Sequence, residues 1–370
     1  MAPTLKPLKH VPRGRGASGN PSGRFETKSI VPELPTEPWE EAELAEDLKR
    51  GPRTEVFPDN TKSVLTKNDS PDIAFTWSLN PYRGCEHGCG YCYARPYHEY
   101  LGLSAGLDFE SKIFAKHEAA ALLRKELAKK SWKPETVVMS GVTDCYQPIE
   151  RELKITRACL EVFLEFKNPV AIITKNRLVA RDIDILAELS RYKAAGVYIT
   201  LPTLDAELAG KLEPRASRPS ARLETIRELA KAGIPVGISL APVIPGLNDH
   251  EIPAILRAAR DAGARRAFHT ILRLPGAVAQ IFSEWLEANE PLKKERILSL
   301  VRDVRGGQLN DSNFKNRMTG IGERAEQIHA LFQLWYRKLN FGQEQFSLST
   351  AHFTQPRPAS PQLGLFDGLD

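Results

Sequence analysis

Short apolar runs alternate with longer amphipathic stretches along the chain beyond about residue 72. The apolar runs, rich in β-branched residues, predict strands at 73–79, 136–140, 170–174, 196–200, 235–241 and 267–272. Helical spacing of apolar residues predicts helices at 117–130, 153–166, 179–190, 220–232, 251–262, 291–307 and 323–339. Gly233 and Gly263 stand just after two of these segments, where glycine commonly ends a helix.

Strands that alternate with helices predict an α/β fold built from parallel βα units with right-handed crossovers. The six units expected here fit either an open doubly wound sheet or a partial, six-fold βα barrel, and the pattern alone does not choose between them. Around this core, at about 70–275, we expect a segment at 1–60 that is mostly disordered, a helical extension at 276–345 and a flexible tail at 346–370. The basic stretch 13–25 has a second interpretation, in which it lies on the domain near a nucleic acid or over the active site.

Composition narrows the class of protein without naming a partner. The 370 residues are 42% hydrophobic and 26% charged, and no apolar run is long enough to span a membrane. The first residues carry basic side chains but no apolar segment typical of a secretion signal, so we expect a cytoplasmic protein. The net charge of +5 allows a polyanionic partner without requiring one.

Three of the five cysteines, Cys85, Cys89 and Cys92, lie in a glycine-rich segment after the first predicted strand. An odd cysteine count with this clustering favours a metal or redox site in a reducing compartment over disulfides. A structural zinc ion needs a fourth ligand, which His87 or His98 could supply. An iron-sulfur cubane held by three thiolates instead leaves one iron open for chemistry.

The C-x3-C-x2-C spacing, with Tyr91 before the third cysteine, resembles the cluster motif of the radical S-adenosylmethionine (SAM) superfamily. The resemblance implies a partial barrel in which Cys85, Cys89 and Cys92 hold a 4Fe-4S cluster, and the fourth iron chelates S-adenosyl-L-methionine. It also implies reduction by an external one-electron donor such as flavodoxin or ferredoxin, and cleavage to methionine and a 5′-deoxyadenosyl radical that removes hydrogen from the substrate.

The ends of the predicted strands carry polar residues where a βα barrel builds its site. Those that we expect to bind the cofactor are Ser140, Thr143, Asp144, Lys175 and Thr200. In this superfamily the second strand usually contacts the amino group of the cofactor, and a lysine suits its carboxylate. For each residue taken alone, a solvated loop position remains an alternative.

The segments VTDCYQPIE and LEPRASRPSARLETIRELAKAGIPVGISLAPVIPGLND narrow the resemblance to the branch related to spore photoproduct lyase. That enzyme reverses a thymine dimer, so the resemblance implies a nucleic-acid substrate, with DNA favoured. Tyr91 and Tyr93 flank Cys92 as the tyrosine pair of the lyase does, and Cys145 is the candidate hydrogen donor. A packed, inert thiol is an equal alternative for Cys145.

Several other residues stay open between structural and functional roles. Cys159 shares helical spacing with apolar neighbours and is predicted to be core, and His269 fits a core histidine or a ligand equally well. Glu213, Arg215 and Arg218 follow the fourth predicted strand and fit a phosphate backbone, the cofactor carboxylate or a solvated loop.

The C-terminal tail holds a short apolar peptide, and its residues of interest are Gln362, Leu363, Leu365 and Phe366. It resembles the peptide by which bacterial polymerases and repair proteins bind the sliding clamp, which implies delivery to DNA; packing on its own domain is the alternative. The leading hypothesis is therefore a radical enzyme acting on nucleic acid. Its competitors are radical chemistry on RNA, protein or a small molecule, and a non-catalytic iron-sulfur adaptor.

Overall fold

A curved seven-stranded sheet forms the centre of the computed structural model, which describes residues 12–26, 52–343 and 347–356. The strand order is β10-β9-β8-β7-β6-β3-β2. The strands are β2 (Leu65–Lys67), β3 (Trp77–Leu79), β6 (Val137–Met139), β7 (Val170–Thr174), β8 (Ala195–Thr200), β9 (Val236–Val243) and β10 (Arg266–Ile271). All neighbours pair in parallel except β2, which pairs antiparallel with β3.

The strand order settles the choice that the sequence pattern left open. A doubly wound sheet reverses its order at a switch point. Here the six parallel strands follow one another in chain order without a reversal, as in a βα barrel that stops short of closure. All six predicted strands are confirmed at their expected places, and the fold is the partial barrel of α/β class.

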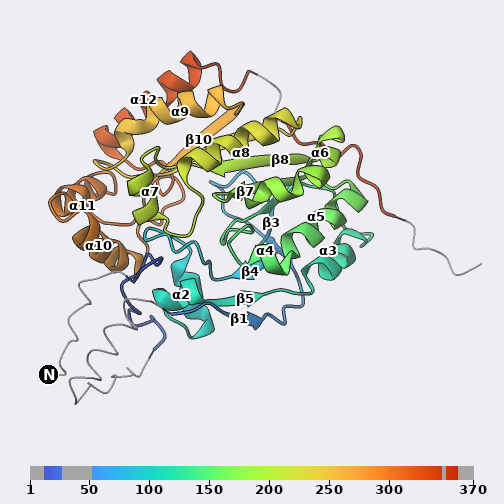
Figure 1. The fold of residues 1–370 in the computed structure, drawn as a ribbon, viewed down its shortest axis with the longest axis horizontal. Helices are drawn as coiled ribbons and strands as arrows, with labels where there is room; N and C mark the ends of the chain where they lie inside the picture. The colour runs from blue at the N-terminus through green and yellow to red at the C-terminus, as the bar shows by residue number, and fades with distance from the viewer. Residues whose placement is uncertain (1–11, 27–51, 344–346, 357–370) are drawn as a thin grey trace, which may run out of the picture.

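The helices predicted between the strands are also confirmed, and Figure 1 shows them around the outside of the sheet. They are α3 (Ala119–Leu127), α5 (Ile155–Phe166), α6 (Ile183–Arg191), α8 (Pro219–Lys231) and α9 (Ile252–Asp261). Gly233 and Gly263 adopt φ of +77° and +112° directly after α8 and α9, which agrees with their expected role as helix ends. Short helices that the pattern did not predict are α4 (Glu150–Leu153), η2 (Arg177–Asp182), α7 (Ala206–Leu212) and η3 (Asp249–Glu251).

A second, three-stranded sheet holds both ends of the stretch that contains Cys85, Cys89 and Cys92, which we call the cysteine segment. Its order is β1-β5-β4, with β1 at Glu55–Pro58, β4 at Tyr82–Arg83 and β5 at Lys112–Ala115. Because β4 pairs antiparallel with β5, the chain between them, residues 84–111, begins and ends at this sheet. This excursion contains the three cysteines, η1 (Arg95–Leu101) and α2 (Leu107–Ser111). The sequence pattern did not predict these strands, because their two to four residues lie outside the regular alternation of strands and helices.

Three helices follow the last strand: α10 (Val278–Asn289), α11 (Lys294–Asp303) and α12 (Gly322–Lys338). Buried residues of α10 and α11 pack with Cys89 and Tyr91, whereas α12 contacts β10 and α9. The C-terminal helices therefore support both the cysteine segment and the open edge of the sheet. Among the described residues, no helix combines the length and apolar character needed to cross a membrane.

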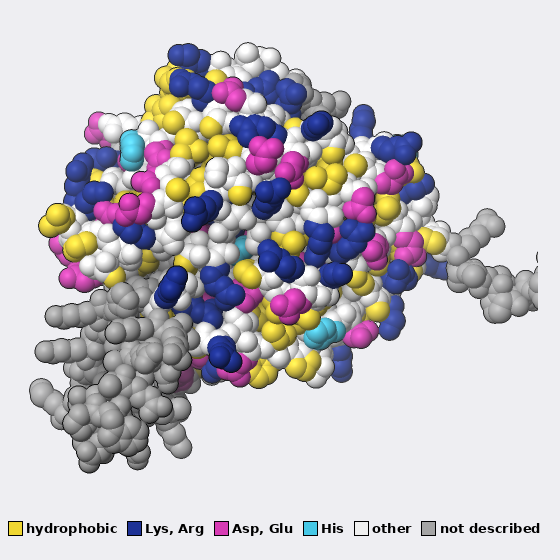
Figure 2. All heavy atoms as spheres, in the orientation of Figure 1, with side chains coloured by type: hydrophobic (Ala, Val, Ile, Leu, Met, Phe, Trp, Pro, Cys, Tyr) yellow, Lys and Arg dark blue, Asp and Glu magenta, His cyan; other side chains and the backbone are white. Residues whose placement is uncertain are grey.

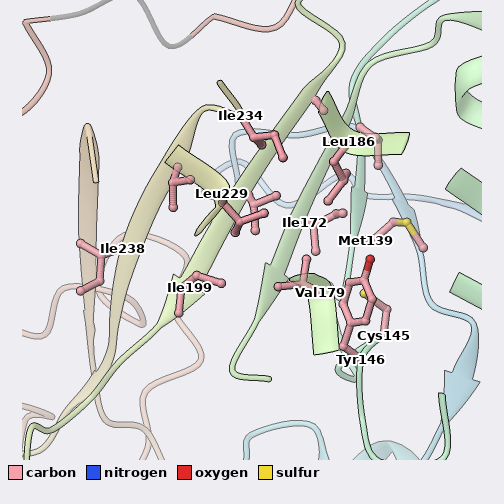
Figure 3. Close-up of a cluster of buried hydrophobic side chains, with 14 of the residues drawn as sticks. Met139, Cys145, Tyr146, Ile172, Val179, Leu186, Ile199, Leu229, Ile234 and Ile238 are labelled. Carbon is pink, nitrogen blue, oxygen red and sulfur yellow. The ribbon is translucent and has the colours of Figure 1, made fainter. Parts of the chain in front are cut away.

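Between the sheet and the helices lies the main hydrophobic core, part of which Figure 3 shows around Ile172, Val179 and Leu186. Cys159 is completely buried there, which confirms its prediction as a core residue. His269 on β10 packs against Phe332 of α12, with ring centroids 4.3 Å apart, and its Nε2 has no hydrogen-bond partner among the described residues. His269 is thus a packing residue, the first of its two expected roles.

The buried position of His269 predicts that the protein loses stability in mild acid. Burial, followed by the neighbouring His329, lowers the pKa of His269 to about 4. The unfolded chain therefore binds a proton that the folded chain excludes, so stability is full above about pH 6.5 and falls as the pH approaches 4. We expect His269 to account for a loss of roughly 2 kcal/mol between pH 7.5 and 5.

This prediction is checked by urea unfolding, followed by circular dichroism, of the natural protein and of His269→Leu. The His269→Leu variant should lose less stability between the two pH values, and an unchanged pH dependence would contradict the prediction. His250 lies on an exposed turn, so His250→Leu is the matched control and should keep the pH dependence of the natural protein.

Candidate active site

The three cysteines of the excursion between β4 and β5 converge on one place. Cys85 and Cys89 are buried, each in its own small apolar cluster, and Cys92 packs against both clusters. Two backbone turns shape the segment, with the amide of Gly88 donating to the carbonyl of Cys85 and that of Cys92 to Cys89. All three cysteines are free thiols.

The surroundings of these thiols fit an iron-sulfur cluster. Burial raises the pKa of Cys85 to about 12 and that of Cys89 well above its usual value, so three thiolates here need a positive group to bind them. Among the described residues, no three or more His, Cys, Asp or Glu side chains are arranged to hold one metal ion. A four-iron cluster asks for a different arrangement, with a separate iron for each of Cys85, Cys89 and Cys92.

One buried arginine holds the backbone of the cysteine segment. The guanidinium of Arg95 donates two hydrogen bonds to the carbonyl of Cys89 and further bonds to the carbonyls of Ala105 and Gly106. Its charge is paired with Glu110 at 2.5 Å, and both side chains are fully buried. No local pattern indicates this pair, because the carbonyl groups that Arg95 binds are brought together only by the fold.

The stretch 12–26 lies against the cysteine segment, and we call it the N-terminal strap. The amides of Gly16 and Ala17 donate to the Glu110 carboxylate at 3.0 and 2.9 Å. Gly16 is so close to Gly88 that a Cβ atom on it would stand 1.6 Å from the Gly88 carbonyl oxygen. Of the two interpretations of the basic stretch 13–25, the structure places it on the domain beside the cysteines. The strap is therefore a placed part of the segment 1–60, for which mostly disordered structure stays a prediction.

Asp144 joins the cysteine segment to the ends of β6 and β7. Its carboxylate accepts hydrogen bonds from the Thr174 hydroxyl and the Lys175 amide, and its Oδ2 lies 3.4 Å from Nδ1 of His87. Burial alone would raise the pKa of Asp144, but His87 and Lys175 hold it below its ordinary value. The Lys175 ammonium is in turn surrounded by Cys89, Glu213 and Asp144, which raise its pKa against the effect of burial.

The remaining strand-end residues differ in the groups that they bind. The Ser140 hydroxyl accepts from the amide of Cys145, and the Thr143 hydroxyl donates to the carbonyl of Tyr82 at 2.8 Å. Thr200 is buried at the end of β8, where its carbonyl accepts from Arg222. Asp144 and Lys175 thus lie beside Cys85, Ser140 and Thr143 are bound to Cys145 and Tyr82, and the backbone of Thr200 is bound to α8.

The two tyrosines around Cys92 face different surroundings. Tyr91 is buried and donates its hydroxyl to Glu213, which is also bound by Arg222 at 2.5 Å. Tyr93 is 39% exposed, and its hydroxyl donates to the carbonyl of Gly141 at 2.7 Å. The expectation of a solvated or phosphate-binding Glu213 is wrong, because Arg222 and Tyr91 hold this carboxylate inside the protein.

The loop that contains Glu213 also binds the cysteine segment from a second side. Arg215 pairs with Glu86 at 3.0 Å, and its amide donates to the carbonyl of His87. Arg218 precedes α8 as its N-cap residue. His98, the other alternative zinc ligand, packs edge-on against Phe109 and Phe114, and His87 contacts Asp144 and Asn176.

Cys145 lies in the hydrophobic core with no exposed surface, close to Tyr146 in Figure 3. Burial, followed by Asp144, raises the pKa of its thiol well above the ordinary value. Cys145 thus follows Asp144 directly, and its amide is bound to the Ser140 hydroxyl. Its thiol is packed in the hydrophobic core. The candidate peptide residues Gln362, Leu363, Leu365 and Phe366 lie outside the described residues.

Comparisons with known proteins agree with this geometry. The model of the radical SAM superfamily matches residues 79–259. Uncharacterized protein Rv2578c of Mycobacterium tuberculosis is 34% identical over 244 residues, which cover 65% of this chain and 72% of that protein. The radical SAM Nalpha-GlyT isomerase of Pseudomonas phage M6 is 26% identical over 176 residues, 46% of this chain and 34% of that protein.

The fold also matches a solved structure. A mutant of spore photoproduct lyase with bound AdoMet and dinucleoside spore photoproduct superimposes with a TM-score of 0.51 over 77% of this chain and 78% of that one. The identity of 14% makes this a likeness of fold.

The close approach of the strap to the cysteine segment predicts a steric test at Gly16. In Gly16→Ala the new methyl group would collide with the Gly88 carbonyl, so the strap must move away from the cysteines. Forcing a methyl group into such a contact costs about 1–3 kcal/mol. We expect the reconstituted variant to lose its visible cluster absorbance to a chelator several-fold faster than the natural protein.

Gly19→Ala is the matched control, since a Cβ atom there meets nothing within 4 Å. It should retain the cluster as the natural protein does. Equal rates of cluster loss for Gly16→Ala and Gly19→Ala would show that the strap does not protect this site.

Proposed function

We propose, from the premise that this chain belongs to the radical SAM superfamily, that it repairs or modifies nucleic acid, with DNA as the favoured substrate. It is a radical SAM enzyme, and its cofactors are a 4Fe-4S cluster and S-adenosylmethionine. What carries the choice of substrate is Tyr93, an exposed aromatic ring directly after the third cluster cysteine. The guanidinium of Arg273 lies 4.8 Å from the centre of that ring.

An aromatic face with a cation beside the cluster suits a nucleotide. The ring can contact a base, and the guanidinium can bind a phosphate oxygen. The +5 net charge is compatible with a polyanion, and Figure 2 shows many Lys and Arg side chains, interspersed with Asp and Glu, across the visible face. The spore photoproduct lyase structure, which holds a dinucleoside photoproduct, supports the same class of substrate through a shared fold.

In this proposal each site residue has a role that its position allows. Cys85, Cys89 and Cys92 bind three irons of the cluster. Lys175, with its ammonium beside the cysteines, attracts the carboxylate of the cofactor, and Asp144 fixes the Lys175 backbone. The other proposed cofactor contacts are Ser140, Thr143 and Thr200. Reduced by one electron from flavodoxin or ferredoxin, the cofactors supply hydrogen-atom abstraction, which yields methionine and 5′-deoxyadenosine.

The groups proposed to return a hydrogen atom or position the substrate are Tyr91, Tyr93 and Cys145. Of these, Tyr93 alone has an exposed ring, and so it is the one that a substrate can contact directly. Tyr91 is bound to Glu213 inside the protein, and its role is to position the third cysteine. Cys145 is the proposed hydrogen donor, and its thiol has no exposed surface in this structure.

The assay of 5′-deoxyadenosine by mass spectrometry tests this function. After anaerobic reconstitution, the natural protein should form 5′-deoxyadenosine from S-adenosylmethionine and a chemical reductant. Added DNA that contains the lesion on which the enzyme acts should increase the yield. Cys89→Ala should abolish it, because one iron loses its protein ligand. Cys159→Ala is the matched control, since that thiol lies in the core away from the cysteine segment.

Two outcomes would contradict the proposal. If the protein with a fully assembled cluster formed no 5′-deoxyadenosine, with or without DNA, the result would favour a non-catalytic iron-sulfur adaptor. If an RNA, a peptide or a small molecule stimulated turnover and no DNA did, the radical chemistry would stand, but DNA would be the wrong substrate.

We also propose that the peptide with Gln362, Leu363, Leu365 and Phe366 binds the bacterial sliding clamp and recruits the enzyme to DNA. A few apolar anchors carry most of the binding energy of such peptides. Replacing Leu365 and Phe366 by alanine should therefore weaken binding to purified clamp at least tenfold in calorimetry, whereas Asp370→Ala should leave it unchanged. Equal affinity of both variants would remove the clamp from the proposal.

A further inference from the structure

Five aromatic side chains are exposed in the part of the chain that the structure describes. They are Phe25, Tyr93, Tyr97, Tyr100 and Phe314, with exposed fractions of 59%, 39%, 55%, 65% and 46%. Exposed aromatic rings scattered singly need no explanation, but a contiguous group of them marks a binding surface. These five belong to one neighbourhood, and we call them the aromatic belt.

The outer part of the belt is a group of neighbouring rings that are tilted relative to one another. The ring centres of Phe25 and Tyr100 are 5.4 Å apart, and those of Tyr100 and Tyr97 are 6.4 Å apart. The guanidinium of Arg24 lies 5.3 Å from the Phe25 ring and 5.6 Å from the Tyr100 ring. Arg24 is held in place by Glu99, so the charge stays beside the rings.

The inner part of the belt reaches the cluster cysteines. Tyr93 follows Cys92 directly, and Arg273 covers its ring. Burial lowers the pKa of Arg273, and Tyr93, Arg317 and Tyr97 lie close enough to act on its charge. Arg273 therefore connects the exposed tyrosines of η1 with the ring beside the cluster. No hydrogen bond or ion pair joins its guanidinium to another described residue, so its donors are open to a ligand.

Phe314 joins the belt through Arg317, whose charge also acts on Arg273. The guanidinium of Arg317 lies 4.6 Å from the Phe314 ring and is fixed by two 2.6 Å hydrogen bonds to Asp72. Every ring of the belt thus lies near a guanidinium, either stacked on it or within reach of its charge. Alternating aromatic faces and cations are the chemistry that binds unpaired bases and the phosphates between them.

We propose that the aromatic belt, with Arg24, Arg273 and Arg317, binds a single strand of nucleic acid and leads it to the cluster. This inference rests on the proposed function and adds to it that the substrate is read with its bases unpaired. In a duplex the faces of the bases are covered by their neighbours, so stacking on protein rings requires a single strand or an unstacked region.

Fluorescence anisotropy of the full-length, reconstituted protein tests the inference. The probes are a labelled single-stranded oligodeoxynucleotide, the duplex of the same sequence and the RNA of the same sequence. We expect the single strand to bind at least about tenfold more tightly than the duplex, and Tyr97→Ala to weaken its binding about fivefold or more. Tyr97→Phe, which keeps the ring, should restore the affinity.

Two further variants separate stacking from charge and from general surface effects. Arg273→Gln should reduce the slope of log affinity against log salt by about 0.7, the share of one phosphate contact on a single strand. Leu292→Ala removes an exposed apolar side chain outside the belt and should bind as the natural protein does. All of these side chains are at least partly exposed, so folding is not at risk.

The outcomes distinguish the belt from the function on which it rests. If the natural protein binds the single strand and DNA stimulates 5′-deoxyadenosine formation, but Tyr97→Ala binds equally well, the belt is overturned and the function stands. Preference for the duplex overturns the belt alone. If no nucleic acid binds or stimulates turnover, both fail. Dimerisation that Tyr97→Ala abolishes, without any effect on nucleic acid, would assign the belt to self-association instead.

Discussion

The burial of Cys85 and Cys89 on a stretch without regular secondary structure is the constraint on which the rest of this site depends. A helix pairs its own backbone groups and a strand pairs with its neighbours, but the stretch around the cysteines leaves carbonyl groups for other partners. Arg95 satisfies these carbonyl groups, because its guanidinium donates hydrogen bonds to the carbonyls of Cys89, Ala105 and Gly106. The same guanidinium also donates to the Glu110 carboxylate. Loss of one partner from a buried ion pair of this kind costs about 3–5 kcal/mol, since the other charge is left uncompensated.

The same constraint explains why distant parts of the chain meet here. Glu110 is bound by Arg95 and also by the amides of the N-terminal strap, so the strap and the cysteine segment share one anion. On another side, Tyr91 is tied to α8 through Glu213 and Arg222. Hydrogen bonds are strong in this low-dielectric interior, and an unpaired polar group would be correspondingly costly, so these contacts fix the cysteines in one arrangement.

The sequence predicted the repeating part of the fold well and the enclosing part poorly. Runs such as Val170–Thr174 and helices such as Ile155–Phe166 carry their own periodicity, so their positions could be recognised locally. The cysteine spacing is likewise a local pattern, and it led to the cluster motif. The placement of the strap on the domain was only one of two interpretations, because glycine-rich composition by itself indicates disorder. The contact of Gly16 with Glu110 could not be recognised, because these residues are 94 positions apart. Glu213 was misjudged for the same reason, since a charged residue in a loop is usually solvated.

The opposite environments of Tyr91 and Tyr93 give the site a direction. Both residues flank Cys92, yet the Tyr91 hydroxyl is held inside by Glu213, whereas the Tyr93 ring remains exposed beneath Arg273. The strap and the C-terminal helices pack against the cysteine segment around Gly88, Cys89 and Tyr91, whereas the Tyr93 ring stays accessible. The strap takes part on both sides, because its Gly16 packs on Gly88 while its Phe25 joins the exposed rings at Tyr100, so one segment links the enclosure of the cysteines to the exposed aromatic surface.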